Sequence, residues 1–271
     1  MRAVIIGAGR GRRLEHRTEA IPKTLVEVMG RPILEWVLEA LAAGRLRREE
    51  LVFISGYGEA VLRARYPDFT YVRNPDWEHN NILLSLLCAR AYLGEGFVST
   101  YSDIIYEGAV VDALVKSPHD IVLGCDTAWR RRYERRSHHP ETDAEKVRAE
   151  GERVLELSRR IPSEAASGEF IGVMKLSPRG AASFLDAFDA AKKEFQGRVF
   201  REGRTFEKAY LIDLLQHMLE AGVRMHRVDT DGGYLEIDTL EDLGHAPAWW
   251  ESRRGVSERQ SFARGEEAPR G

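Results

Sequence analysis

The sequence has few cysteines, no long apolar run and no large excess of charge of one sign. Cys88 and Cys125 lie far apart in apolar stretches, so we expect buried free thiols in a reducing compartment instead of a disulfide or a zinc site. No apolar run approaches the roughly 20 residues of a membrane-spanning helix. The formal net charge of −3 does not favour binding to nucleic acid. An apolar segment begins at Arg2 with no signal peptide before it, so we expect a cytoplasmic protein.

What is present is enough apolar sequence for a large core. Hydrophobic residues make up 43% of the 271 residues, as in globular chains. In the first half, short apolar runs typical of strands alternate with segments of helical spacing. Strands are expected at 2–6, 51–55, 69–74, 96–103 and 120–126, and helices at 33–43, 59–66, 82–93 and 109–116. This alternation predicts a three-layer α/β fold with a mostly parallel, Rossmann-like sheet and ligands at the carboxyl ends of its strands.

The second half departs from this alternation. From Asp126 to Glu169 the chain is polar, basic and then acidic, and we interpret it as a substrate-facing insertion with a hairpin around 150–151. Beyond it we expect strands at 168–177, 223–230 and 234–238, and helices at 178–195 and 206–221. Residues 1–250 form one predicted domain, whereas residues 251–271 are poor in apolar side chains and are expected to be a disordered tail. The sequence leaves a homodimer open.

The loop after the first expected strand is rich in glycine but fits neither common phosphate-binding motif. A dinucleotide-binding fold has G-x-G-x-x-G, and here Gly7 and Gly9 are followed by Arg12 at the position of the third glycine. A P-loop has G-x-x-x-x-G-K and then Ser or Thr, and no lysine falls at that place. A nicotinamide-dependent oxidoreductase is therefore disfavoured.

The loop does contain the pattern G-x-G-x-R, at Gly9, Gly11 and Arg13, followed by Lys23 after Pro22. Glycine lets backbone N–H groups turn toward an anion at low steric cost. Arg13 and Lys23 add positive charge where a triphosphate would lie, arginine as a two-point contact and lysine as a point charge. The pattern predicts a nucleotide-binding loop.

Together, AGRGRRL and IPKTLVEVMGRPILEW resemble the signature of the sugar-phosphate nucleotidyltransferase superfamily. The family usually has alanine where this chain has Gly7, a difference of one methyl group. Four later segments, GYGEAVL, NPDWEHNNILLSL, STYSDIIYE and EIDTLEDL, resemble family motifs in the same order, so the resemblance covers residues 1 to about 246. The segment from HHPETDAEKV to GEFIGVMKLS looks closest to the phosphocholine and 2-aminoethylphosphonate cytidylyltransferases, and is also similar to the inositol-phosphate enzymes.

The resemblance implies an enzyme that joins CMP from CTP to a small phosphate or phosphonate and releases pyrophosphate. It implies catalytic roles for Lys23 and Arg13, and Mg²⁺ held by Asp103 and Asp238 near the ends of strands. Glu236 lies on the same strand face as Asp238 and is a further candidate there. Nucleotide contacts are implied for Ala8, Gly9, Gly11, Arg13, Lys23, Gly56, Asn80, Asn81, Ser85 and Ser102.

The acceptor end is expected in the insertion. Asp126, Trp129 and Glu169 are candidates to recognise an amine, and Lys146 is a candidate to meet the acceptor's anion. Tyr133 and Phe170 are further aromatic candidates. These groups suit a zwitterion, so we expect an amine-bearing phosphate or phosphonate in preference to inositol phosphate.

Alternatives remain open for the function and for single residues. The chain could be an inositol-phosphate or other sugar-phosphate nucleotidyltransferase that uses CTP or UTP, or a non-catalytic nucleotide-binding regulator on the same fold. A regulator would not need Lys23, Asp103 and Asp238 together, which favours the enzyme. Asn80 and Asn81 fit either a contact to the nucleotide base or a cap of the following helix.

Overall fold

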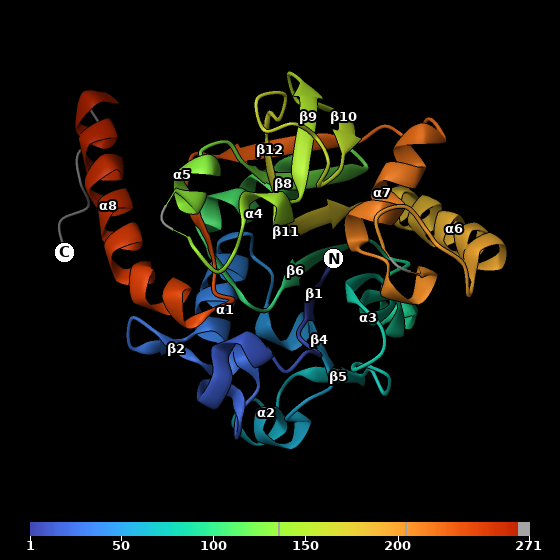
Figure 1. Ribbon diagram of the computed structural model, residues 1–271, viewed down its shortest axis with the longest axis horizontal. Coiled ribbons are helices and arrows are strands. Elements are labelled where there is room, and N and C mark those ends of the chain that lie inside the picture. Colours follow the sequence, from blue (N-terminus) through green and yellow to red (C-terminus); the bar gives the residue numbers. More distant parts are fainter. Residues whose placement is uncertain (135, 204, 265–271) are drawn as a thin grey trace.

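A mixed nine-stranded sheet forms the centre of the computed structural model, which describes residues 1–134, 136–203 and 205–264 (Figure 1). The strand order is β5-β4-β1-β6-β11-β8-β12-β10-β9. These strands are β1 (Arg2–Ile6), β4 (Leu51–Ser55), β5 (Thr70–Arg73), β6 (Phe97–Tyr101), β8 (Ile121–Asp126), β9 (Lys146–Glu150), β10 (Arg153–Leu157), β11 (Gly168–Leu176) and β12 (His226–Thr230). Two short pairs lie outside the sheet: β2 (Glu27–Val28) with β3 (Arg31–Pro32), and β7 (Ile104–Tyr106) with β13 (Tyr234–Glu236).

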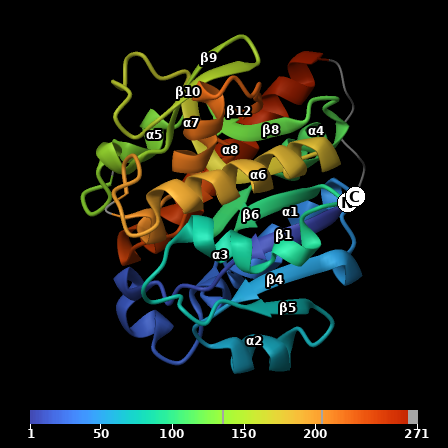
Figure 2. The ribbon, with the colours of Figure 1, turned by 90° about the vertical axis from the view of Figure 1, so that its right-hand side faces the viewer.

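Helices cover both faces of the sheet, so the expected three-layer α/β fold is confirmed. One buried apolar cluster includes side chains of α1 (Ile33–Ala43), α2 (Glu59–Arg65) and α4 (Gly108–Lys116). The other includes side chains of α3 (Ile82–Cys88), α6 (Pro178–Phe195) and α7 (Leu211–Glu220). Figure 2 looks onto this second layer, with the strands behind it.

The spacing of apolar residues accounts for the two layers. Along β1, Ala3 and Ile5 enter the cluster on the α1 side, and Val4 and Ile6 enter the cluster on the α3 side. Side chains alternate across a strand, so a strand that is apolar throughout is buried on both faces. The buried side chains of α1 recur at helical spacing and form one stripe, Ile33, Leu34, Val37, Ala40 and Leu41.

Strand direction divides the sheet. β1, β4, β5 and β6 are parallel neighbours, as are β8 and β12. β9, β10 and β11 run antiparallel to every strand beside them. β9 and β10 belong to the segment where the sequence departs from alternation and form the expected hairpin, and β11 begins at the end of that segment. A hairpin needs only a short turn, whereas parallel neighbours need a crossover, usually through a helix.

Several elements are shorter than the sequence predicts. The expected helix at 82–93 ends at Cys88 and is followed by a 3-10 turn, Arg90–Tyr92. The expected helix at 206–221 is a 3-10 turn, Phe206–Lys208, and then α7. The expected strand at 223–230 begins at His226. Apolar periodicity locates an element but not its ends, because capping and tertiary contacts set those.

The chain after Trp250 differs from the expected disordered tail as far as Arg264. It continues α8 (Leu240–Arg264), which begins after the strand-end residue Asp238 and runs along one edge of the molecule (Figure 1). Trp250 packs edge-on against Trp36 of α1, with ring centroids 5.7 Å apart. A helix that is already nucleated extends at little cost, even through polar sequence. For residues 265–271 the expectation lies outside the described residues.

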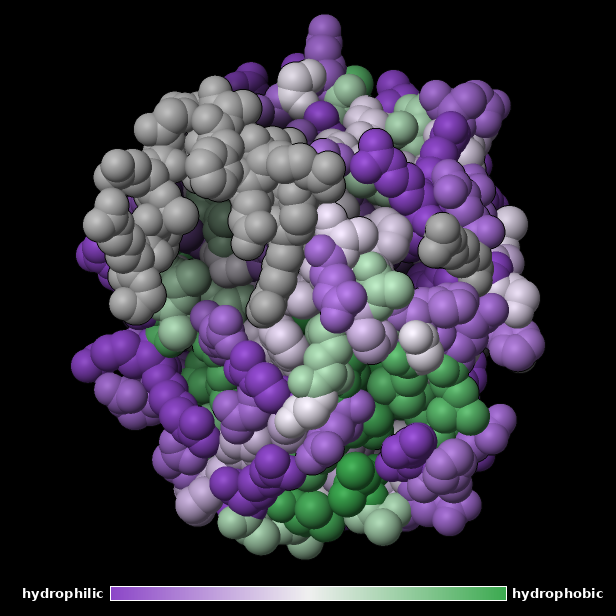
Figure 3. Space-filling view, turned by 90° about the vertical axis from the view of Figure 1, so that its left-hand side faces the viewer, coloured by the Kyte–Doolittle hydropathy of each residue, from purple (hydrophilic) through white to green (hydrophobic). Residues whose placement is uncertain are grey.

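The face that carries α8 is mainly hydrophilic, with apolar side chains gathered in patches below the grey atoms (Figure 3). No helix within the described part of the chain combines the length and the apolar character needed to cross a membrane. Cys88 and Cys125 are both free thiols. Cys125 is buried, as the sequence predicts, and burial raises its pKa to about 12, whereas Cys88 is only half-buried.

Gly172 in β11 has a left-handed backbone conformation and packs against Tyr101, which lines the cavity described below. Its φ is +75°, and a Cβ atom there would lie 2.3 Å from the ring of Tyr101. We expect Gly172→Ala to lower the free energy of unfolding by more than the ~1–2 kcal/mol of left-handed strain alone, because the ring must also move. Urea unfolding measures this against Gly151→Ala, whose φ is +56° with no atom within 4 Å of the added methyl group. Equal losses in the two variants would contradict a role for Tyr101.

Candidate active site

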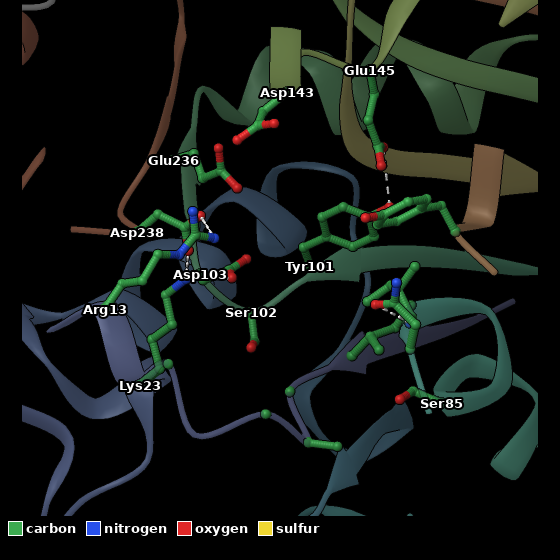
Figure 4. A pocket seen from close by; sticks show the side chains of 18 of the residues that line it. Arg13, Lys23, Ser85, Tyr101, Ser102, Asp103, Asp143, Glu145, Glu236 and Asp238 are labelled. Carbon is green, nitrogen blue, oxygen red and sulfur yellow. Dashed lines mark hydrogen bonds and ion pairs between the residues drawn. The ribbon is translucent and has the colours of Figure 1, made fainter. Parts of the chain in front are cut away.

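A cavity of about 510 Å³ opens at the carboxyl ends of β1 and β6 (Figure 4). Seen from close by, Arg13, Lys23, Asp103 and Asp238 cluster at one end of it, and Tyr101 and Glu145 lie at the other. The complete lining is Ile6, Gly7, Ala8, Gly9, Gly11, Arg13, Lys23, Trp77, Asn80, Asn81, Ile82, Ser85, Tyr101, Ser102, Asp103, His139, Asp143, Glu145, Arg159, Glu169, Phe170, Tyr210, Tyr234, Glu236 and Asp238. The position agrees with the rule that open α/β sheets bind ligands beyond the carboxyl ends of their strands.

The glycine loop after β1 forms one wall, and close packing explains its glycines. A Cβ atom on Gly7 would lie 2.5 Å from the Phe53 ring and 2.7 Å from Ser102 Oγ. Gly11 has a φ of +72°, and a Cβ atom there would lie 2.6 Å from the Lys23 side chain. Gly11 therefore leaves the space through which Lys23 reaches the cavity.

Lys23 is a buried cation between two carboxylates. Its Nζ donates to Asp103 Oδ2 at 2.7 Å and to Asp238 Oδ1. Burial by itself would lower the pKa of Lys23, but the nearby carboxylates of Asp103, Asp238 and Glu236 outweigh burial and raise it. Lys23 is therefore a permanent positive charge at neutral pH.

Asp238 is the centre of this cluster. Besides Lys23, the guanidinium of Arg13 donates to its Oδ2. Burial would raise the pKa of Asp238, but the positive charges of Lys23 and Arg13 lower it. Its backbone N–H donates to Asp242 Oδ2 at 2.9 Å in the first turn of α8, which holds Asp238 in place.

Glu236 and His139 complete this end of the cavity. His139 Nδ1 lies 3.6 Å from Glu236 Oε2 and 3.8 Å from Asp238 Oδ2. Burial and the charges of Asp238 and Asp103 raise the pKa of Glu236 well above its ordinary value. Burial and the positive charge of Arg136 lower the pKa of His139. Sequence reasoning singled out Glu236 but missed His139, for which the only signal is its place in the polar insertion.

The asparagine segment lies beside the glycine loop and is internally hydrogen-bonded. Asn74 Nδ2 donates to Asn80 Oδ1 and to Ser85 Oγ, both at 2.9 Å. Asn81 Oδ1 accepts from Ile82 N at 2.9 Å and so caps α3. Asn80, Asn81 and Ser85 all line the cavity. Asn81 therefore has the capping contact that the sequence left open and also faces the cavity.

Gly56 differs from the other nucleotide-binding candidates because it does not line the cavity. A Cβ atom on Gly56 would lie 2.5 Å from the carbonyl oxygen of Ala8 and 2.8 Å from the Trp77 ring. Gly56 thus supports the glycine loop from behind. Trp77 does line the cavity and was missed, because a lone tryptophan in a polar segment carries no periodic signal.

Phe170, named as a further aromatic candidate, lines the cavity, and of the four main acceptor candidates only Glu169 does so. Its carboxylate accepts from Arg132 and, at 2.7 Å, from Tyr133 Oη. The other three, Asp126, Trp129 and Lys146, lie outside the cavity lining.

Each of these three side chains is buried behind the cavity wall. Asp126 Oδ1 accepts from the backbone N–H groups of Ala128 and Gly232, at 3.0 and 2.7 Å. Lys146 Nζ donates to the Arg159 carbonyl at 2.7 Å, and Trp129 packs edge-on against Tyr133. These contacts fix the path of the insertion.

The far end of the cavity instead presents Glu145 and Arg159. Arg159 Nη2 donates to Glu145 Oε1 at 3.3 Å, and Tyr101 Oη donates to Oε2 at 3.3 Å. The Arg159 guanidinium lies 3.8 Å from the centre of the Tyr210 ring, in a cation–π contact. Burial raises the pKa of Glu145 to about 7, and Arg159 only partly offsets it. Sequence reasoning took Lys146 for this site, whereas its neighbour Glu145 faces the cavity.

A family model, described as the MobA-like NTP transferase domain, matches residues 3–195. The chain belongs to this family. This NTP transferase is 24% identical over 253 residues to the CTP:phosphoglutamine cytidylyltransferase of Campylobacter jejuni, covering 90% of this chain and 98% of the relative. It is 27% identical over 134 residues to the choline-phosphate cytidylyltransferase of Streptococcus pneumoniae, covering 48% of this chain and 57% of that relative.

Solved structures show the same fold. The NTP transferase superimposes on the inositol-1-phosphate CTP transferase of T. maritima with a TM-score of 0.68 and 19% identity, over 89% of this chain and 90% of the other. With the CTP:phosphocholine cytidylyltransferase of Streptococcus pneumoniae the TM-score is 0.62 at 18% identity, over 89% and 95% of the two chains.

Proposed function

We propose that this NTP transferase transfers CMP from CTP to a small phosphorylated or phosphonylated acceptor and releases pyrophosphate. The observation that carries the proposal is the Lys23 ammonium, held between Asp103 and Asp238 beside the glycine loop. The cytidylyltransferases among the relatives support CTP as the donor.

The chemistry suits the groups at this end of the cavity. An acceptor oxygen forms a bond to the α-phosphorus while the bond to the bridging oxygen of the β-phosphate breaks, and pyrophosphate leaves with that oxygen. The acceptor is already an anion, so no general base is needed. Charge accumulates on the oxygens, and Lys23 and Arg13 are fixed cations that stabilise it.

The same carboxylates fit a divalent cation such as Mg²⁺. The Lys23 ammonium contacts both Asp103 and Asp238, so their oxygens converge on one point. Oxygen ligands of this kind are those that Mg²⁺ prefers, and a bound cation would neutralise charge on the triphosphate. Asp103 and Asp238 are the residues that would hold it.

For the cytosine base we propose Asn80, Asn81 and Ser85, which line the cavity on the side of α3. An amide offers both a donor and an acceptor, as the edge of a pyrimidine requires. Asn74 fixes the Asn80 amide through two hydrogen bonds, of 2.9 and 3.0 Å.

For the acceptor we propose an amine-bearing molecule recognised by Glu145 and Glu169. Both carboxylates line the far end of the cavity. The aromatic rings of Tyr101, Phe170 and Tyr210 also line the cavity. Arg159, also in the lining, favours an acceptor that carries an acidic group besides the phosphate. An amino-acid-like phosphate offers an amine to the carboxylates and an acidic group to Arg159, whose present partner is Glu145. The phosphoglutamine enzyme is a relative over nearly its whole length.

A pyrophosphate-release screen tests this function directly. Four nucleoside triphosphates are combined with phosphocholine, 2-aminoethylphosphonate, hydroxyethylphosphonate, inositol phosphate and phosphoglutamine. We expect turnover with CTP and the highest kcat/KM with an amine-bearing acceptor. A preference for inositol phosphate would contradict the amine-bearing acceptor but would still support the transferase activity. Binding of CTP without turnover on any acceptor would favour a regulator.

Glu145 should make acceptor affinity depend on pH. Its carboxyl, with a pKa of about 7, is largely neutral at pH 6 and largely charged at pH 8, and Arg159, Tyr101 and Glu169 are the groups that face it. We expect KM for an amine-bearing acceptor to fall as pH rises across this range. In Glu145→Gln, KM should be roughly 10- to 100-fold higher at pH 8, the effect of one charged hydrogen bond.

The acceptor's phosphate titrates near pH 6 as well. The readout is therefore the difference between the two proteins, since both see the same acceptor. Identical pH profiles would exclude Glu145 as the amine partner. Glu164→Gln, in the loop between β10 and β11, is the matched control because Glu164 does not line the cavity.

A further inference from the structure

We propose that His139, Glu236 and Asp238 bind one divalent transition-metal ion, with Mn²⁺ preferred to Mg²⁺. One ligand atom from each of the three residues lies within 4.8 Å of the other two. Asp238 is shared with the carboxylate pair described above, whereas His139 and Glu236 add a nitrogen and a further carboxylate. Binding of the ion does not depend on the proposed function, whereas a role of the ion in catalysis does.

His139 is the residue that points to a bound ion. Only 4% of its surface is exposed, and its Nδ1 has no hydrogen-bond partner within the described part of the chain. This nitrogen faces Glu236 Oε2 at 3.6 Å and Asp238 Oδ2 at 3.8 Å, distances too long for hydrogen bonds. A buried polar atom without a partner destabilises the fold, and a ligated ion removes that cost.

The spacing between His139 and the two carboxylates suits a single ion. Two ligand atoms, each about 2.1 Å from an ion, lie about 3.0 Å apart at a right angle and about 4.2 Å apart in line. The separations of 3.6 and 3.8 Å fall between these limits. On the other side of the ring, Nε2 lies 3.9 Å from Asp143 Oδ2. A carboxylate behind a ligating imidazole commonly orients the ring.

The charges at this end of the cavity also favour a dication. Four carboxylates face the two cations Arg13 and Lys23 in the lining: Asp103, Asp143, Glu236 and Asp238. A divalent ion would balance this set. Imidazole is a better ligand for transition metals than for Mg²⁺, which prefers oxygen, so the nitrogen of His139 selects among divalent ions.

The fold holds His139 in this position through α8. Arg136, three residues before it, donates from Nε to Asp242 Oδ1 at 2.7 Å. Glu241 accepts from the backbone N–H groups of Ser137 and His138, at 2.8 and 3.1 Å. The start of α8 therefore fixes both Asp238 and the loop that carries His139, which brings the nitrogen to the carboxylates.

Electron paramagnetic resonance of Mn²⁺ bound to the full chain, without nucleotide, tests the site. In the unaltered protein we expect electron spin echo modulation from one imidazole ¹⁴N, and a lower Kd for Mn²⁺ than for Mg²⁺. His139→Gln should remove the modulation and raise the Kd for Mn²⁺ on the order of 10- to 100-fold. Glu236→Gln should raise the Kd but keep the modulation. His138→Gln, an exposed neighbour, is the control and should change neither.

Three results would overturn the site: no binding of Mn²⁺ by the free protein, Mn²⁺ bound without ¹⁴N modulation, or an unchanged spectrum in His139→Gln. Thermal unfolding in chelator shows whether each variant is folded, and pyrophosphate release with Mg²⁺ is measured in parallel. Modulation without transfer from CTP would support the metal site and contradict the proposed function. Transfer without modulation would support the proposed function and contradict the metal site.

Discussion

Replacing Asp238 by asparagine is expected to lower kcat by roughly a thousandfold or more, the scale on which preorganised charge and bound metal act in catalysis. Asp238 contacts both cations of the site, Lys23 and Arg13, and is held by the first turn of α8. Asparagine keeps its shape and removes the negative charge, so the cations lose their shared partner and a metal ion loses a ligand. Steady-state kinetics with CTP and the preferred acceptor measure the loss.

Asp103→Asn should have an effect of the same order, because Asp103 is the second carboxylate on Lys23. Both variants should remain folded, as Lys23 keeps one carboxylate in each. Urea unfolding checks this, since a buried lysine with no partner would lower stability by about 3–5 kcal/mol. Asp112→Asn on α4, an exposed ion pair with Lys116, is the matched control. Near-normal turnover in either variant would exclude that aspartate from the metal site.

Lys23→Ala is expected to lower kcat because the transition state loses one preorganised donor. The activation free energy should rise by roughly 3–4 kcal/mol. The KM for CTP should change little, because a charge aimed at oxygens that gain charge during the reaction contributes to rate more than to binding. Removing this fixed cation should also raise the affinity for Mn²⁺, since Lys23 and the ion compete for the Asp238 carboxylate.

In Lys23→Ala we thus expect kcat to fall while the affinity for Mn²⁺ rises. Lys116→Ala, which removes an exposed lysine on α4, is the control for general charge effects. An unchanged kcat with a raised KM for CTP would make Lys23 a binding residue only. A weaker affinity for Mn²⁺ would mean that Lys23 organises the carboxylates and does not compete with the ion.

Some of this arrangement could be predicted because it depends on short stretches of chain. The spacing of Gly11, Arg13 and Lys23 reflects one loop and the space that a glycine leaves for the lysine side chain. Asp103 lies just beyond β6, at the edge of the α/β sheet where ligands bind, whereas Asp238 lies just beyond β13, which pairs with β7 outside that sheet. The three-layer fold follows from apolar runs that alternate with helical spacing.

The site residues of the insertion were harder to predict, because the path of the hairpin decides which of its side chains face the cavity and which face the core. Glu145 and Lys146 are adjacent, and either could have faced the ligand until β9 and β11 were paired. Asp126 could have bound an amine, but it accepts two backbone N–H groups of its own fold. A charged residue in a sequence does not show whether its partner is a ligand or the chain itself.

What the sequence by itself determined was the layered fold, the glycine loop, and the lysine and two aspartates that converge on one point. Only the tertiary structure decided that His139 joins them, since Asp242 and Glu241 of α8 hold a loop about one hundred residues earlier in the chain. Only it decided, too, that residues 251–264 continue a helix. Local patterns reflect contacts between near neighbours, whereas these outcomes depend on hydrogen bonds and packing between distant segments, which no single stretch of sequence encodes.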